Sequence, residues 1–359
     1  MASSSVATTR RVLLAAAAGL INLSPTAKPA FAAYTVVASG NVAQKRSRLT
    51  EVEKLFKEKP DDPYVFGEKA QLEADIKALK RNSEFASSLS RDLAGGKVSF
   101  LQSIRVGVPD MDEAVRFWTR GCGALILSTK RDGSGANVTR IGFGAQSLRV
   151  EDGAKFALEL VEAKGEGVGV VSTDTSALQY IQLSIPVFRL SQVMANGGDI
   201  ESAYGWTQLT APGGLPLRVH IDEQRRDPFE FVGLRVSDMA AAIAHYEGLG
   251  MKKVSETDAR RKFELGGSFG VRQQTGDAFE PDREPGTVQM TFGDPTLTTG
   301  LLLLPPKKRG AKLSLGKVVP CELSVIGKSP TTTDTAVSPD GLKSVYVDAD
   351  AFETAVAAA

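Results

Sequence analysis

The side chains that most often bind metals or act as nucleophiles are scarce in this chain. Among 359 residues there are only two histidines and two cysteines. His220 follows Arg218 by two positions, so a strand here would place both side chains on the same face. With so few soft ligands, a transition-metal site built from protein groups alone is difficult to assemble.

The two cysteines lie far apart in sequence. Cys122 occupies a Gly-Cys-Gly turn, and Cys321 falls in a predicted strand of another domain. A disulfide between them would be chemically allowed in an exported compartment, but the sequence does not set their distance.

Length and composition indicate a globular protein with more than one domain. Hydrophobic residues make up 42% of the chain and charged residues 24%, both ordinary values. The 43 Lys and Arg nearly balance the 42 Asp and Glu. This balance gives no electrostatic argument for nucleic acid or an anionic membrane surface as a partner.

Residues 1–33 predict a targeting segment. Arg10 and Arg11 precede an apolar run, residues 12–21, which is about half of the roughly 20 residues that a spanning helix needs. Small residues flank Phe31, which predicts cleavage before Ala33. The arginine pair is typical of a twin-arginine export signal. We expect a mature chain in an exported compartment, with no later segment apolar enough to span a membrane.

The remaining elements must form a helical extension followed by repeated strand–helix–strand modules. Residues 34–96 have apolar side chains at helical spacing, and Pro60 and Pro63 divide them into a predicted helical hairpin. Beyond residue 96, an Asp-Met turn occurs at Asp110 and again at Asp238, each suited to begin a helix. This internal duplication predicts four modules arranged as two domains, residues 97–224 and 227–350.

These repeats resemble the glyoxalase I family of the vicinal-oxygen-chelate superfamily, in the duplicated form found in plant chloroplasts. The resemblance covers roughly residues 98–356. It rests on several short segments in family order: Val108–Met111, Phe156–Leu160, Asn196–Ile200, Asp227–Phe229, Leu234–Met239, Tyr246–Met251 and Ser338–Asp348. The resemblance implies an α+β fold of two tandem domains, each built from paired βαβββ modules that curl around a divalent metal.

The metal ligands that the resemblance implies are largely absent. Family members place His or Gln on the first strand of a module and Glu on the last. Here the four positions of the first domain are Ser103, Glu159, Tyr180 and Arg218, so only Glu159 matches. A permanent cation at Arg218 repels a metal and is expected to pair with Glu159 instead. A rearranged cluster of Glu159 with His220 is the alternative.

The second domain also lacks the metal ligands that the resemblance implies. Its corresponding positions are Phe231, Leu302, Cys321 or Glu322, and Val345, and its fourth module is short of a full helix. His245 stands where the family carries Phe, so we expect it to be partly buried against the sheet.

Arg235 resembles the family arginine that grips a glutathione carboxylate. The alternative is an exposed strand arginine without a ligand.

Three functions follow as hypotheses. The first is a degenerate, non-catalytic scaffold in the thylakoid lumen, or in a bacterial periplasm, that uses its N-terminal helices to dock on a protein partner such as a photosynthetic membrane complex. It needs no cofactor. The second is a lactoylglutathione lyase that uses nickel or zinc with Glu159. The third is a metal-free binder of small molecules, with an apolar cavity lined by Phe231, Leu302 and Val345.

Overall fold

The computed structural model describes residues 42–358, apart from 61–62, 151–152, 166–167, 170–173, 187–188, 204–205, 222–225, 255–283, 309–310, 317 and 330–332. The predicted targeting segment lies outside the described residues. The chain divides into two units, residues 1–80 and 81–359, which are described separately. No helix in the described part of the chain has both the length and the apolar content needed to cross a membrane.

The first unit contains the predicted helical hairpin. Helix α3 spans Val42–Glu58 and α4 spans Pro63–Ala94, so the break at Pro60 and Pro63 is confirmed. The two helices run antiparallel, because Lys45 pairs with Asp75 and Arg48 Nε lies 2.8 Å from Glu68 Oε1. The last part of α4, from Arg81, belongs to the second unit.

The second unit contains the four predicted modules in chain order. The first consists of β1 (Phe100–Val108), α5 (Met111–Arg116), the π-helix η2 (Phe117–Cys122), β2 (Leu125–Arg131), β3 (Asn137–Gly142) and β4 (Ala157–Glu162). The second consists of β5 (Leu178–Ile185), α6 (Arg189–Ala195), β6 (Asp199–Ala203), β7 (Trp206–Thr210) and β8 (Pro216–Ile221). The third consists of β9 (Phe229–Arg235), α7 (Met239–Gly248), β10 (Lys252–Lys253), β11 (Val288–Thr291) and β12 (Gly300–Leu304).

The fourth module is the incomplete one, as its sequence predicted. It consists of β13 (Glu322–Ile326), β14 (Thr335–Val337) and β15 (Lys343–Val347), with no helix among the described residues between β13 and β14. Helix α10 (Ala349–Ala357) follows it.

The repeated Asp-Met turns begin helices by the same hydrogen bond. The Asp110 carboxylate accepts from Glu113 N at 2.9 Å at the start of α5, and the Asp238 carboxylate accepts from Ala241 N at 3.0 Å at the start of α7. Each carboxylate thereby satisfies a backbone donor of the first helical turn.

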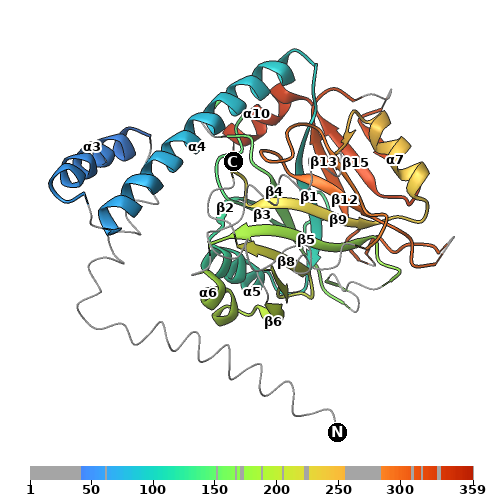
Figure 1. Cartoon of the computed structure of the whole chain (residues 1–359). Coiled ribbons are helices and arrows are strands. Elements are labelled where there is room, and N and C mark those ends of the chain that lie inside the picture. Colours follow the sequence, from blue (N-terminus) through green and yellow to red (C-terminus); the bar gives the residue numbers. More distant parts are fainter. Residues whose placement is uncertain are drawn as a thin grey trace, which may run out of the picture. The chain divides into compact units, whose positions relative to one another are not determined.

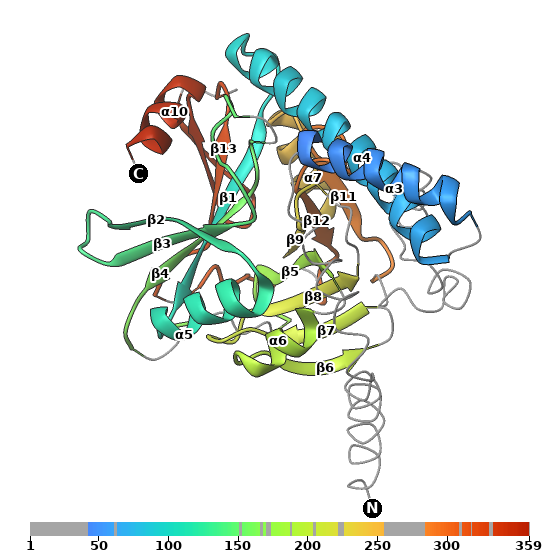
Figure 2. The same ribbon diagram turned by 90° about the vertical axis from the view of Figure 1, so that its left-hand side faces the viewer.

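The strands form two mixed sheets, each of which combines one module from the first half of the chain with one from the second half (Figures 1 and 2). Sheet one has the order β14-β15-β13-β1-β4-β3-β2, and sheet two has the order β10-β11-β12-β9-β5-β8-β7-β6. Modules one and four therefore share sheet one, and modules two and three share sheet two. From the sequence we predicted that modules one and two together enclose one site. That prediction is wrong, because the two modules belong to different sheets. The antiparallel pairs β1–β13 and β5–β9 join the modules instead.

A single hydrophobic core contains side chains from both sheets and from the helices. Phe229 of β9 is fully buried, with its ring centroid 5.8 Å from that of Trp118, 5.1 Å from Phe143 and 5.2 Å from Phe156. Helices α5 and α6 lie side by side in both views (Figures 1 and 2). Cys122 and Cys321 are both buried and free, so no disulfide joins them.

Candidate functional site

The structure divides the four candidate ligand positions of the first repeat between the two sheets. Ser103 and Glu159 lie on β1 and β4 of sheet one, whereas Tyr180 and Arg218 lie on β5 and β8 of sheet two. Arg218 and Glu159 do not pair. The expected ion pair is wrong because its two residues belong to different sheets.

The positions of the second repeat complete each set. Phe231 and Leu302 join Tyr180 and Arg218 in sheet two. Glu322 and Val345 join Ser103 and Glu159 in sheet one, with Cys321 directly before β13. Each sheet therefore carries one complete set of four positions, two from each repeat.

Sheet one has a row of alternating charges where the family would hold its metal. Ile104, Val106, Leu158 and Leu160 face the core, so the intervening residues of β1 and β4 face the other side of the sheet. In register across five strands lie Arg140, Glu159, Arg105, Glu322 and Lys343. Each carboxylate of this row thus has a cationic residue on both neighbouring strands.

Glu159, the only position that matches the family, is held by Arg140. The Nε of Arg140 lies 3.4 Å from Glu159 Oε1, and the two side chains are only 15% and 16% exposed. Arg140 also donates to Gln102 Oε1. Burial lowers the pKa of Arg140, and the charge of Glu159 opposes that shift. The carboxylate of Glu159 therefore already has a cationic partner.

A β-bulge disturbs the first-strand position. The register of β1 against β13 shifts between Leu101 and Ser103, which leaves Gln102 as the extra residue. Gln102 donates to Gln146 Oε1, and Gln146 donates to the carbonyl of Lys155 at 2.9 Å. These amides are thus committed to each other and to Arg140, and Ser103 supplies only a hydroxyl.

Neighbouring groups also oppose a metal in sheet one. Arg105 lies in register between Glu159 and Glu322, and it pairs with Asp132. Hydrogen bonds from Ser134, with a further contribution from Arg105, lower the pKa of Asp132 to about 2. Burial raises the pKa of Cys321 to about 12, so its sulfur stays a neutral thiol. With Val345 at the fourth position, these residues do not fit nickel or zinc.

Sheet two has an aromatic and aliphatic cluster at the equivalent positions. Tyr180, Phe231, Leu302 and Leu304 are at most 6% exposed and contact one another. Arg218 lies over the Tyr180 ring, with its guanidinium carbon 4.0 Å from the ring centroid, and its Nη1 donates to the Tyr180 hydroxyl at 3.2 Å. The four positions thus hold a cation–π pair and two hydrocarbon side chains, none of which is a usual nickel or zinc ligand.

One sequence prediction about this cluster is wrong. Phe231 and Leu302 do not share a cavity with Val345, because Val345 lies on β15 of sheet one. Glycine at position 233 lets the Tyr180 ring lie against β9, since a Cβ there would come within 3.0 Å of ring carbons. The described positions of sheet two are thus filled by the chain itself.

Arg235 is engaged by the chain's own groups and is only 3% exposed. Its Nη1 and Nη2 donate to Glu284 at 2.9 and 2.8 Å, and it also contacts Gln179 Oε1 and the carbonyl of Pro305. Hydrogen bonds from Arg235, and then from Lys307, lower the pKa of Glu284 to about 2. The expectation that Arg235 is exposed is wrong. Its guanidinium instead forms a bidentate pair with the Glu284 carboxylate.

The histidines do not assemble a rescued site among the described side chains. His220 pairs with Ser184 and Trp206 in strand register, but its side chain lies outside the described part. His245 is partly buried, as predicted, 5.1 Å from the Tyr246 ring, and burial lowers its pKa. Across the residues that the structure describes, no three His, Cys, Asp or Glu side chains are grouped to hold a metal ion.

Comparison with known proteins places the fold. The structure resembles glyoxalase I from Zea mays with a TM-score of 0.52 and 20% identity, covering 72% of this chain and 95% of the maize chain. A mutant of the maize enzyme gives the same TM-score and identity and is covered over 97% of its length. No family model matches the sequence, and no curated protein matches it. The chain therefore has the fold of a tandem glyoxalase I-like, vicinal-oxygen-chelate protein.

Proposed function

We propose that this chain, with its glyoxalase I-like fold, is a non-catalytic scaffold or interaction protein. The observation that carries the proposal is the environment of Glu159. Its carboxylate is paired with Arg140 and lies in register beside Arg105. A glyoxalase reaction needs a metal to stabilise an enediolate and a free carboxylate to move a proton. Neither role suits a carboxylate that is already paired with Arg140.

The first test measures metal binding and turnover. The mature chain, beginning at Ala33, is dialysed against nickel or zinc, and bound metal is measured by mass spectrometry. Isomerisation of the methylglyoxal–glutathione adduct is then assayed. We expect less than about 0.1 metal ion per chain and turnover equal to the uncatalysed rate, because the ligand positions of sheet one hold a hydroxyl, an alkyl side chain and a carboxylate paired with Arg140.

Two controls separate this proposal from its alternatives. Stoichiometric metal, with turnover that disappears in Glu159→Gln, would establish the lactoylglutathione lyase and refute the scaffold. Asp112→Asn, at an exposed carboxylate of α5, serves as the matched substitution that should leave either outcome unchanged. Tight binding of methylglyoxal or glutathione without metal or turnover would favour a metal-free binding protein.

We also place the proposed partner surface on the helical hairpin of the first unit. Phe66 of α4 is 61% exposed and Leu55 of α3 is 39% exposed. An aromatic side chain that remains this exposed in a folded unit is suited to bury itself in a protein interface. The twin-arginine pattern of residues 1–33 supports the thylakoid lumen, or a bacterial periplasm, and a photosynthetic membrane complex is the partner we propose.

The second test uses the exposed apolar side chain of the hairpin. Phe66→Ser should weaken binding to isolated thylakoid complexes, measured by co-sedimentation, by about thirtyfold, since hot-spot aromatics contribute about 2 kcal/mol or more to binding. Val337→Ser removes a similarly exposed side chain, 54% exposed on β14, and should have no effect. Equal loss in both variants, or no loss in Phe66→Ser, would show that the hairpin is not the docking surface.

A further inference from the structure

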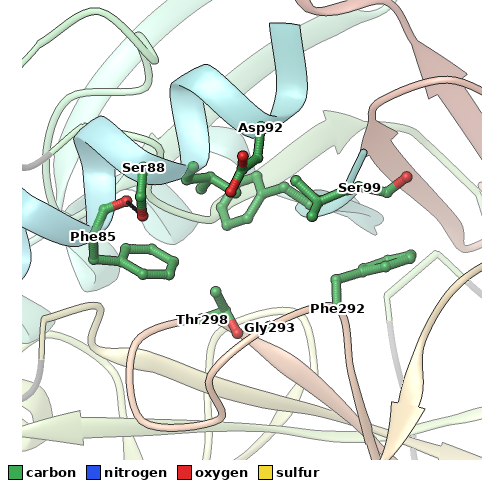
Figure 3. Close-up of a pocket in the computed structure, with 10 residues that line it drawn as sticks. Phe85, Ser88, Asp92, Ser99, Phe292, Gly293 and Thr298 are labelled. Carbon is green, nitrogen blue, oxygen red and sulfur yellow. Dashed lines mark hydrogen bonds between the residues drawn. The ribbon is translucent and has the colours of Figure 1, made fainter. Parts of the chain in front are cut away.

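A pocket away from both sheet sites lies between the end of α4, the start of β1 and the β11–β12 connection. Its volume is about 170 Å³, and all of its lining residues belong to the second unit. Figure 3 shows the rings of Phe85 and Phe292 on opposite sides, with Asp92 on the helix side and Thr298 on the strand side. A third ring, that of Phe100, completes the wall.

Asp92 places a negative charge at the pocket. This charge lies at the C-terminal end of α4, in the last turn, where the helix dipole is negative and an acidic side chain destabilises the helix. Its carboxylate has no hydrogen bond or ion pair with any described residue. Local sequence rules are broken most often at functional sites, so this carboxylate needs an explanation outside the helix.

The carboxylate, the helix end and the aromatic faces all attract the same kind of ligand. The carbonyl end of α4 carries partial negative charge, and the face of each phenyl ring is negative. One cation is already nearby, because Arg226 lies 4.9 Å from the centroid of Phe85. Arg226 is only 2% exposed and donates to the carbonyl oxygens of Gly153, Ala154 and Leu297.

We propose that this pocket binds a small organic ammonium ion, of the trimethylammonium type, between the rings of Phe85, Phe100 and Phe292 and against the Asp92 carboxylate. The volume suits such a group, because a cavity of about 150 Å³ admits benzene. A methylated ammonium buries its methyl groups against the rings and keeps its charge toward Asp92. Recognition by aromatic rings distinguishes it from a metal ion, which would need several oxygen ligands.

The test compares two ligands of the same shape and different charge. Choline and its uncharged isostere 3,3-dimethylbutan-1-ol are titrated into the full chain by calorimetry. Choline should bind with one site per chain and at least about tenfold more tightly than the isostere, since cation–π and charge contacts together are worth about a factor of ten or more. Equal affinities, or no binding of choline at millimolar concentration, would overturn the proposal.

Three variants locate the site. Asp92→Asn keeps the shape of the side chain and should weaken choline about tenfold without changing the isostere. Phe292→Leu keeps apolar volume but removes a ring, and it should weaken choline more than the isostere. Glu84→Gln changes an exposed charge on the same helix and should leave both affinities unchanged. If choline binds equally well to Asp92→Asn and to the unaltered chain, its site lies elsewhere and the assignment fails. Thermal denaturation of each variant verifies that it is folded.

Discussion

Replacement of Phe229 by alanine should lower the free energy of unfolding by about 3 to 5 kcal/mol, the range measured for large aromatic side chains in cores. The ring is fully buried and contacts three other aromatic rings, those of Trp118, Phe143 and Phe156. Phe229 comes from the third module and its partners come from the first, so the substitution removes a contact between the two repeats. Because no side chain is free to fill the space, the cavity persists.

Chemical denaturation followed by fluorescence and by circular dichroism measures this effect. We expect the second unit of Phe229→Ala to unfold in one transition at lower denaturant concentration, with both probes in agreement. Phe66→Ala is the matched control, because Phe66 is 61% exposed and its loss should change stability by less than about 0.5 kcal/mol. Two separate transitions for the two repeats would contradict the shared core.

The repeated modules could be predicted from the sequence, but which modules share a sheet could not. The turns at Asp110 and Asp238 are local features, and local hydrogen bonds to the helix N-terminus fix them. Which modules share a sheet depends on long-range pairing between strands such as β1 and β13. Strand β1 is almost entirely buried and β13 is largely apolar, so the residue pattern alone does not select one partner for either strand.

The candidate site shows the same division between local and long-range information. The loss of ligands at Ser103, Tyr180 and Arg218 is read directly from residue type. The partners that explain the loss come from other strands, as Arg140 does for Glu159. Arg140 carries no sequence signal, because a strand arginine on a half-exposed face is common. Glu284 was missed for the same reason, since nothing before β11 marks it as the partner of Arg235.

The two sheets share one physical feature, an arginine close to the candidate ligand positions. In each sheet an arginine lies at or beside a candidate ligand position: Arg140 lies beside Glu159, and Arg218 stands at such a position itself and lies over Tyr180. A guanidinium supplies the positive charge that neighbouring carboxylates or aromatic faces favour, but it cannot accept an electron pair from a substrate oxygen as a metal does.

The second large effect is expected at Glu284. Glu284→Gln leaves the buried Arg235 guanidinium without its carboxylate partner, and removal of one member of a buried ion pair costs about 3 to 5 kcal/mol. Glu284 itself is 24% exposed, and water can partly replace it. We therefore expect a loss of about 2 kcal/mol at pH 7, measured by urea denaturation. Glu84→Gln, on an exposed face of α4, should change stability very little.

The pH dependence of this loss identifies its cause. The pKa of Glu284 is lowered from an ordinary value near 4.5 to about 2 by its hydrogen bonds with Arg235 and Lys307. A lowered pKa in the folded state stabilises the protein above pH 4.5, and that contribution disappears as the pH falls through 2. The stability difference between the unaltered chain and Glu284→Gln should therefore shrink from pH 5 to pH 2. A difference that stays constant over this range would mean that the side chain acts through packing rather than charge. In Arg235→Met/Glu284→Gln, which removes both charges, stability should partly return, because the buried guanidinium is then no longer left unpaired.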